Sequence, residues 1–365
     1  MGSYFSLWIF AILVTSMTLS AQTRTFVYVS NADSNDISVF GFNAKTGVMT
    51  PLEIVSLSGQ PGFTTPMAVS PDKRFLYVAN RTKPYTVATF VIDKGSGRLT
   101  RLSDGPLEDA MAYIFVDRSG HFLLSASYPG DKITVNPINP DGVVGPPQQV
   151  IRDVPKAHSI QTGPANRFAL APSLGSDTVR QYKFNGSTGM LSPNSPAATN
   201  VLAKDGPRHF VFHPNGKVVY LLCETSATLY AFDYGPQTGV LRQKQSVSFK
   251  VKGYTFLDNN DWYAADLHIT PNGQFLYASV RSASTIAAFK VDPSTGLVSL
   301  IDQFPTETQP RGFHIDPSGR YLLAAGQASN HVAVYAIDQN TGELTFLKRY
   351  PVGKNPNWIE FVTLP

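Results

Sequence analysis

The chain has 365 residues, of which 15% are charged, and its formal net charge at pH 7 is +4. This weak basic excess, without a run of Lys or Arg, gives no support to nucleic-acid binding. With 28 Gly and 27 Pro and no long amphipathic stretch, the sequence is typical of an all-β protein with many turns. The single cysteine, Cys223, lies in the apolar run VVYLLC, and we predict that it is buried and inert.

The N-terminal segment has the pattern of an export signal. Residues 1–23 carry no charged side chain, the run from Leu7 to Leu19 is apolar, and Ser20 and Ala21 are small residues suited to cleavage. The apolar run is shorter than the roughly 20 residues of a membrane-spanning helix. We therefore predict a signal peptide over 1–21, one domain over 22–365, and a periplasmic or secreted location, with an uncleaved membrane anchor as the alternative.

A turn signature recurs seven times along the rest of the chain. An apolar strand runs into a turn that ends in glycine, as in FKVDPSTGLV from Phe289. The seven glycines are Gly47, Gly97, Gly142, Gly189, Gly239, Gly296 and Gly342. A repeat of about 45–57 residues made of short strands is typical of β-propeller blades. The sequence thus predicts an all-β, seven-bladed β-propeller with four-stranded antiparallel blades.

A second signature, Pro-(Asp/Asn/Ser)-Gly, marks another turn in most repeats, as in TPNGQFLYASVR from Thr270. Each blade then has the order strand A, this turn, strand B, a loop, strand C, the glycine turn and strand D. The first run, FVYVSN from Phe26, resembles a strand B, and the last, NPNWIEFV from Asn355, resembles a strand A. We expect the two ends to complete one blade together, so that the ring has no open edge.

Antiparallel order places the ends of the B strands and the starts of the A strands at one rim, opposite the turns. Polar residues that gather at this rim are Arg81, Tyr128, Glu224, Arg281 and Gln327 after B strands, and His158, Arg208, His209, Asp266 and Arg311 near the starts of A strands. An excess of arginine over carboxylate there favours a small anion. Any one of these residues also fits a solvated rim position, and His209 or His268 also fits a contact between blades. Convergence from at least six blades favours a site at the mouth of the channel.

The longest interval between turn glycines places roughly ten extra residues between Ser246 and Asp266. The segment lies at the rim that carries the polar residues, and it contains Trp262 and Tyr263. We predict that it forms a loop folded over a pocket.

The segments GPRHFVFHPNG from Gly206, WYAADLHITPNG from Trp262 and TETQPRGFHIDPSG from Thr306 resemble the lactonase family of seven-bladed propellers. The resemblance covers about residues 24–365. It implies a hydrolase for a small anionic sugar lactone, like the 6-phosphogluconolactonases of this family. The family also includes a fungal carboxy-cis,cis-muconate cyclising enzyme, and the resemblance implies that His158, Arg208, Glu224 and Arg281 match positions proposed as catalytic in that enzyme.

Two features depart from the family pattern. Tyr113 stands where the family often has a histidine, which would change contacts to the substrate. The export signal is the other departure, because a phosphorylated sugar lactone of central metabolism is a cytoplasmic compound. An exported member of the family would act on another lactone or serve another role.

Lactone hydrolysis needs a base to activate water, donors for the developing oxyanion and a cation for the anionic group. The sequence has no G-x-S-x-G elbow and no zinc-binding spacing, so we expect neither a serine nucleophile nor a metal, and no cofactor. We hypothesise that Glu224 or His158 is the base and that Arg208 and Arg281 stabilise the oxyanion or the carboxylate. The substrate-binding residues of this hypothesis are His209, Asp266, His268, Arg311 and Gln327.

Two other functions remain open at this point. One is a secreted propeller that binds without catalysis, because propellers serve both roles. The other is a cycloisomerase that forms or opens a lactone from a dicarboxylate with the same residues. The segment GPRH, with the matching Glu224 and Arg281, favours the lactonase. We expect the mature protein to be a monomer without a stable membrane span.

Overall fold

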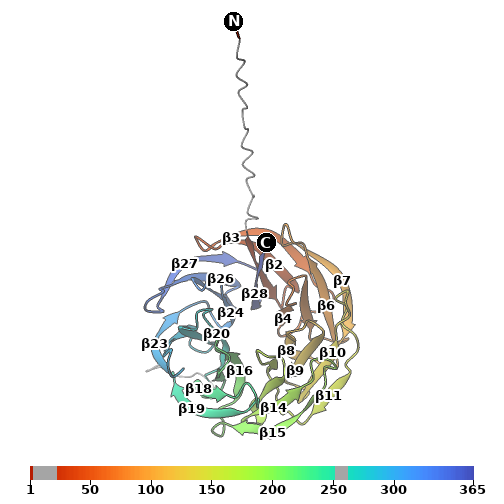
Figure 1. Ribbon diagram of the computed structural model, residues 1–365, viewed down its shortest axis with the longest axis vertical. Coiled ribbons are helices and arrows are strands. Elements are labelled where there is room, and N and C mark those ends of the chain that lie inside the picture. The colour runs from red at the N-terminus through yellow and green to blue at the C-terminus, as the bar shows by residue number, and fades with distance from the viewer. Residues whose placement is uncertain (3–22, 251–261) are drawn as a thin grey trace.

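The computed structural model describes residues 1–2, 23–250 and 262–365. Seven four-stranded antiparallel sheets surround a central channel, which confirms the predicted seven-bladed β-propeller (Figure 1). In the described part of the chain, a single 3-10 turn is the only helical element, and no helix there could span a membrane. Residues 3–21 of the predicted signal peptide and the segment 251–261 of the predicted loop fall outside the described residues.

Each blade runs from the channel outward, and blade one joins both ends of the chain. Blade one contains β28 (Pro356–Leu364), β1 (Arg24–Asn31), β2 (Asp36–Asn43) and β3 (Val48–Ser56); blade two contains β4 (Met67–Val69), β5 (Phe75–Asn80), β6 (Thr86–Ile92) and β7 (Leu99–Pro106); blade three contains β8 (Met111–Val116), β9 (Phe122–Ser127), β10 (Lys132–Pro137) and β11 (Gln149–Arg152).

The remaining four blades follow the same order around the ring. Blade four contains β12 (Gln161–Thr162), β13 (Phe168–Ser173), β14 (Thr178–Phe184) and β15 (Leu191–Asn200), with η1 (Leu174–Ser176) after β13; blade five contains β16 (Pro207–Phe212), β17 (Val218–Cys223), β18 (Thr228–Tyr234) and β19 (Leu241–Ser248); blade six contains β20 (Ala264–Ile269), β21 (Phe275–Val280), β22 (Thr285–Val291) and β23 (Val298–Pro305); blade seven contains β24 (Pro310–Ile315), β25 (Tyr321–Gly326), β26 (His331–Ile337) and β27 (Leu344–Pro351).

Burial within a blade follows its position in the ring. The second strand of blade five, β17, is buried at every residue, because neighbouring blades cover both of its faces. Its outermost strand, β19, is mostly exposed. Cys223 ends β17 and is fully buried, as predicted, and this burial raises the pKa of its thiol well above the ordinary value. The core thus consists of layers between adjacent blades.

The turn glycines of the repeat join one blade to the next. Gly97 has a φ of +68°, and a side chain there would also overlap the ring of Phe26 in blade one. The hydroxyl of Tyr28 donates to the carbonyl oxygen of Gly97 at 2.7 Å. Gly239 of blade five meets Phe168 of blade four in the same way. The repeated glycine therefore serves both the turn and the contact between blades.

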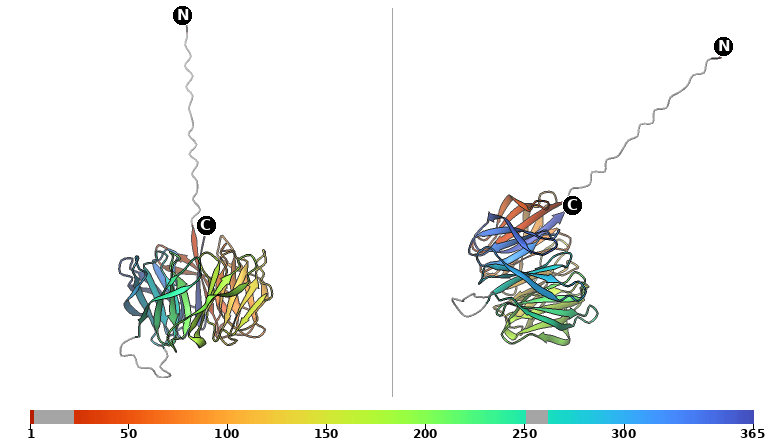
Figure 2. Two further views of the ribbon diagram at one scale, coloured as in Figure 1. Left: turned by 60° about the horizontal axis from the view of Figure 1, so that its bottom comes forward. Right: turned by 90° about the vertical axis from the view of Figure 1, so that its left-hand side faces the viewer.

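The ring closes through blade one, as the sequence predicts. β28 pairs with β1 antiparallel, from Arg24 opposite Leu364 to Asn31 opposite Pro356. Figure 2 shows the resulting disc from the side, with the C-terminus on one of its faces. That face carries the turns between the first and second strands and is called the turn face below. The opposite end of the channel is called the mouth.

Candidate active site

Glu224 lies between two arginines at the mouth. It follows β17, and its Oε2 accepts a hydrogen bond from Nε of Arg208 in β16 at 2.8 Å. Its Oε1 accepts one from Nη2 of Arg281, which follows β21 in blade six, at 2.6 Å. The side chains of Arg208 and Glu224 are 1% and 14% exposed. This buried group links two blades and leaves both carboxylate oxygens occupied.

The charges of this group determine its protonation. Burial alone would raise the pKa of Glu224, but Arg281 and Arg208 outweigh it and lower this pKa to about 2. Burial lowers the pKa of Arg208 to about 10, so its guanidinium is charged at neutral pH. Arg208 also donates to the carbonyl oxygen of Ala265 through Nη1. Glu224 is consequently a fixed anion with little capacity to act as a base.

Arg311 and His158 complete what we call the mouth cluster, with Arg208, Glu224 and Arg281. Arg311 lies in β24, and within the described residues its guanidinium makes no hydrogen bond and no ion pair. Burial and the charges of Arg208 and Arg281 lower its pKa. His158 precedes β12 and is 4% exposed, and its Nδ1 is buried without a hydrogen-bond partner. Burial, followed by Arg208, lowers the pKa of His158 well below its usual value, so the ring is neutral.

Asp266 holds two histidines deeper in the channel. Its Oδ1 pairs with Nδ1 of His209 at 2.9 Å, and its Oδ2 pairs with Nε2 of His268 at 3.2 Å. Burial would raise the pKa of Asp266, but His268 and His209 hold it well below its usual value. Burial and the charge of Arg208 lower the pKa of His209 to about 4. Asp266 is therefore an anion beside a neutral His209.

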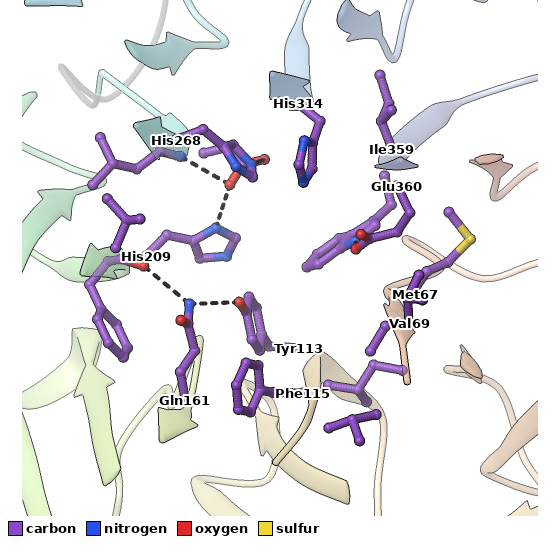
Figure 3. A pocket seen from close by; sticks show the side chains of 18 residues that line it. Met67, Val69, Tyr113, Phe115, Gln161, His209, His268, His314, Ile359 and Glu360 are labelled. Atoms are coloured by element: carbon purple, nitrogen blue, oxygen red, sulfur yellow. Dashed lines mark hydrogen bonds and ion pairs between the residues drawn. The ribbon is translucent and has the colours of Figure 1, made fainter. Parts of the chain in front are cut away.

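A cavity of about 280 Å³ occupies the channel, and Figure 3 shows the side chains around it. His209, Asp266 and His268 line this cavity, whereas none of the five residues of the mouth cluster does. The cavity is also lined by four residues that the sequence pattern did not indicate, namely Gln161, His314, Trp358 and Glu360. In the innermost strand β28, the partly exposed Trp358 and Glu360 alternate with the buried Ile359. This alternation is the pattern from which channel-facing residues could be predicted. Apart from Gln327, the predicted catalytic and substrate-binding residues divide between the mouth cluster and the cavity.

The other rim residues have different partners. Gln327 donates through Nε2 to Oδ1 of Asn355 at 2.7 Å, a contact that links blade seven to blade one. Arg81 donates to Oγ1 of Thr64 at 2.5 Å. The ring of Tyr128 contacts that of His158, with centroids 5.6 Å apart. Of these residues, only Tyr128 directly contacts the mouth cluster.

The described ends of the predicted loop contact the mouth cluster. Trp262 is 4% exposed, and the carbonyl oxygen of Tyr263 accepts a hydrogen bond from Nε of Arg281 at 2.9 Å. The guanidinium of Arg281 lies 5.4 Å from the centroid of the Tyr263 ring. Whether the loop covers a pocket stays a prediction, because residues 251–261 lie outside the described part. Among the described residues, no group of three or more His, Cys, Asp or Glu is arranged to hold a metal ion.

Comparison with known proteins extends this description. The model of the family described as lactonase, 7-bladed beta-propeller, matches residues 27–361. The chain belongs to the lactonase family. A 6-phosphogluconolactonase of Pectobacterium carotovorum is 40% identical to this lactonase-family chain over 287 residues, which are 79% of this chain and 83% of that protein. A 6-phosphogluconolactonase of Yersinia pestis is 41% identical over the same shares. The structure of a periplasmic gluconolactonase of Pseudomonas aeruginosa superimposes on this chain with a TM-score of 0.85, and the two sequences are 27% identical. The match covers 94% of this chain and 100% of the gluconolactonase chain.

Proposed function

We propose that the protein hydrolyses a small anionic sugar lactone at the mouth cluster. The observation that carries the proposal is the charge arrangement there. Glu224 neutralises part of the charge of Arg208 and Arg281, whereas Arg311 has neither hydrogen bond nor ion pair among the described residues. A half-buried guanidinium with free donors suits a carboxylate, a phosphate or a developing oxyanion. Relatives named 6-phosphogluconolactonase, about 40% identical, support the same reaction.

The geometry favours His158 over Glu224 as the general base. Both oxygens of Glu224 accept hydrogen bonds from arginine, whereas Nδ1 of His158 has no hydrogen-bond partner among the described residues. His158 is neutral at pH 7 and lies near Arg208 and Arg311. In this mechanism His158 takes a proton from water as the water oxygen bonds to the carbonyl carbon, and Arg281 and Arg311 stabilise the negative charge that forms on the carbonyl oxygen. When this oxyanion collapses, the ring C–O bond breaks, and the imidazolium of His158 gives its proton to the leaving oxygen, which becomes a hydroxyl group. Glu224 and Arg208 then position the cations.

The test is steady-state hydrolysis of 6-phosphogluconolactone, glucono-1,5-lactone and a muconolactone, with the spontaneous rate subtracted. We expect His158→Gln and Arg281→Ala each to lower kcat/KM by about 10²–10³. Arg98→Ala is the matched control. Arg98 forms an ion pair with Glu53 and follows the turn glycine Gly97, at the end of the blade opposite the mouth. Full activity in both site variants, or no turnover of any lactone by the wild type, would reject the proposal.

Arg311 provides the test of phosphate recognition. If Arg311 binds the phosphate, Arg311→Met should raise KM for 6-phosphogluconolactone about tenfold more than for glucono-1,5-lactone, because only the former carries the second anionic group. Equal changes for the two lactones would limit Arg311 to the stabilisation of the oxyanion. Thermal unfolding of each variant shows whether the fold is retained.

We also propose that the protein is exported. The uncharged N-terminal segment with its apolar run from Leu7 to Leu19 supports this, and so does the similarity to a gluconolactonase described as periplasmic. An anionic sugar lactone other than the cytoplasmic 6-phosphogluconolactone would then be the natural substrate. Cell fractionation with N-terminal sequencing of the protein tests the idea, and recovery of the uncleaved chain from the cytoplasm would contradict it.

A further inference from the structure

The cavity in the channel is separated from the mouth cluster by aromatic rings. The rings of Tyr113, His209 and Trp358 belong to blades three, five and one, which are not neighbours. Their centroids lie 5.2 Å apart for Tyr113 and His209, 5.4 Å for Tyr113 and Trp358, and 6.2 Å for His209 and Trp358. Rings from three blades therefore meet across the channel and narrow it. The cavity extends from these rings to Val69 and Val116, which directly precede turns of the turn face.

Two imidazoles of the cavity, those of His209 and His314, offer hydrogen-bond acceptors, because the hydrogen bond at Nδ1 of each ring determines its tautomer. His209 donates its Nδ1–H to the carboxylate of Asp266, so its neutral ring carries a lone pair on Nε2. This Nε2 is buried without a partner, and His209 is 5% exposed. His314 donates its Nδ1–H to the carbonyl oxygen of Ile315 at 2.8 Å, which leaves the lone pair of its Nε2 free. Burial lowers the pKa of His314 to about 3, so this ring is also neutral.

Glu360 adds another acceptor to the same space. Its Oε1 accepts a hydrogen bond from Nε1 of Trp358 at 2.9 Å, and its Oε2 has no hydrogen-bond partner among the described residues. In Figure 3 the side chains of Glu360, His314 and His209 lie around the cavity. A ligand that reached all of them would have to supply the hydrogens.

The cavity also carries negative charge. Asp266 is an anion, and no described lysine or arginine lines the cavity. Burial raises the pKa of Glu360 to about 7, so this second carboxyl is partly ionised at neutral pH. The rings of Trp358, Tyr113 and Phe115 form part of the wall. Carboxylates together with aromatic faces are the surroundings that proteins use to bind organic cations.

We infer that this cavity is a binding site for a small organic cation, specifically a primary ammonium group. The ammonium has three N–H donors and no acceptor, which complements the free acceptors of His209, His314 and Glu360. It would also balance the charge of ionised Glu360, whose Oε2 has no hydrogen-bond partner among the described residues. A divalent metal fits less well, since the described residues contain no metal-binding group of three. The inference does not depend on lactone hydrolysis, because the mouth cluster does not line this cavity.

Binding is tested by isothermal titration calorimetry of the wild-type protein with ethylammonium chloride. Propan-1-ol, propionate and zinc chloride are titrated in parallel as a neutral, an anionic and a metal probe. We expect one ethylammonium per chain and no binding of the other three. Affinity should rise about tenfold from pH 6 to pH 8, since a carboxyl of pKa about 7 passes from about one-tenth to about nine-tenths ionised. The charged or titratable groups that act on Glu360 are Asp266 and His268 of β20. His209 of β16, His314 of β24 and Tyr113 of β8 line the same cavity, and Arg118, after β8, acts on Tyr113.

Glu360→Gln keeps the shape of the side chain and removes its charge. We expect it to weaken ethylammonium binding about tenfold at pH 8 and to abolish the increase between pH 6 and pH 8. Glu343→Gln, in an exposed turn, is the matched control and should bind like the wild type. The inference fails if Glu360→Gln binds as tightly as the wild type, or if propan-1-ol or propionate binds as well as ethylammonium. It also fails if zinc binds in place of ethylammonium, or if no probe binds.

Discussion

The carboxylate of Glu224 balances the positive charges of Arg208 and Arg281, whose side chains are 1% and 16% exposed. Both the stability of the fold and the arrangement of the site therefore depend on this carboxylate. We predict that Glu224→Gln destabilises the protein by about 3 kcal/mol at pH 7, because it leaves Arg208 charged and 1% exposed without its anion. The pKa of Glu224 is lowered from 4.5 to about 2, so its stabilisation is complete above pH 4.5 and is lost as the pH falls toward 2. The difference in urea-unfolding free energy between wild type and variant should therefore shrink at acidic pH. An equal difference at pH 7 and pH 3 would contradict this account.

Single residues also show what the sequence could predict about the site. The sequence predicts a rim position for Arg208, Glu224 and Arg281, because each lies at the start or end of a strand there. The structure places the three side chains in one hydrogen-bonded group. Gln327 met the same criterion but bonds to Asn355. Position along the strand predicts the rim, whereas the direction of a side chain decides its partner. The rim criterion did not indicate Glu360, because this residue lies in the middle of the last strand and not at its end. Its side chain lines the cavity in the channel.

Among the strands, β28 has the greatest consequence for the ring, since it supplies the channel-side strand of blade one. It pairs with β1 over the whole length of that strand, and it brings Trp358 and Glu360 to the cavity. We predict that deletion of residues 356–365 abolishes cooperative thermal unfolding, because β1 would become an exposed apolar edge. Deletion of Pro365 alone, which lies beyond β28, should leave the melting temperature unchanged. A cooperative transition of the shortened chain near the wild-type temperature would show that blade one does not need this strand.

The seven repeats explain why strand order could be predicted from the sequence. The turn glycines Gly97 and Gly239 have positive φ values and also contact an aromatic ring of the preceding blade. The same residue type is therefore required at the same place in the repeat, which makes the blades countable. Blade four is less regular, since β12 has only two residues, and no repeat signature predicted this.

The whole molecule separates charge along its channel. Arginines exceed carboxylates in the mouth cluster, whereas Asp266 and Glu360 make the cavity beyond the aromatic rings negative. An anionic substrate is therefore attracted to the mouth and repelled from the cavity. The repeats predicted the ring and its mouth, but not this division, because it depends on contacts between Tyr113, His209 and Trp358 from three separate blades.

The buried ionisable groups also determine how stability depends on pH. His158, His209 and His314 have lowered pKa values, so between about pH 4 and 6.5 the unfolded chain binds more protons than the native protein. Stability should therefore rise with pH across this range. Glu360 acts in the opposite sense, since its pKa is raised from 4.5 to about 7 and the native protein loses stability as the pH rises through this interval.

Three histidines outweigh one carboxyl, so we predict that the urea midpoint of the wild type rises from pH 5 to pH 6.5 and then levels off. Glu360→Gln removes the opposing contribution. The variant should match the wild type near pH 4.5 and be more stable at pH 8 by up to about 3 kcal/mol, which corresponds to the shift of the Glu360 pKa. Urea denaturation of both proteins across this range measures the effect. If the variant is less stable at pH 8, the ionised Glu360 has a compensating partner in the native protein, and the cavity is not the uncompensated acceptor site described above.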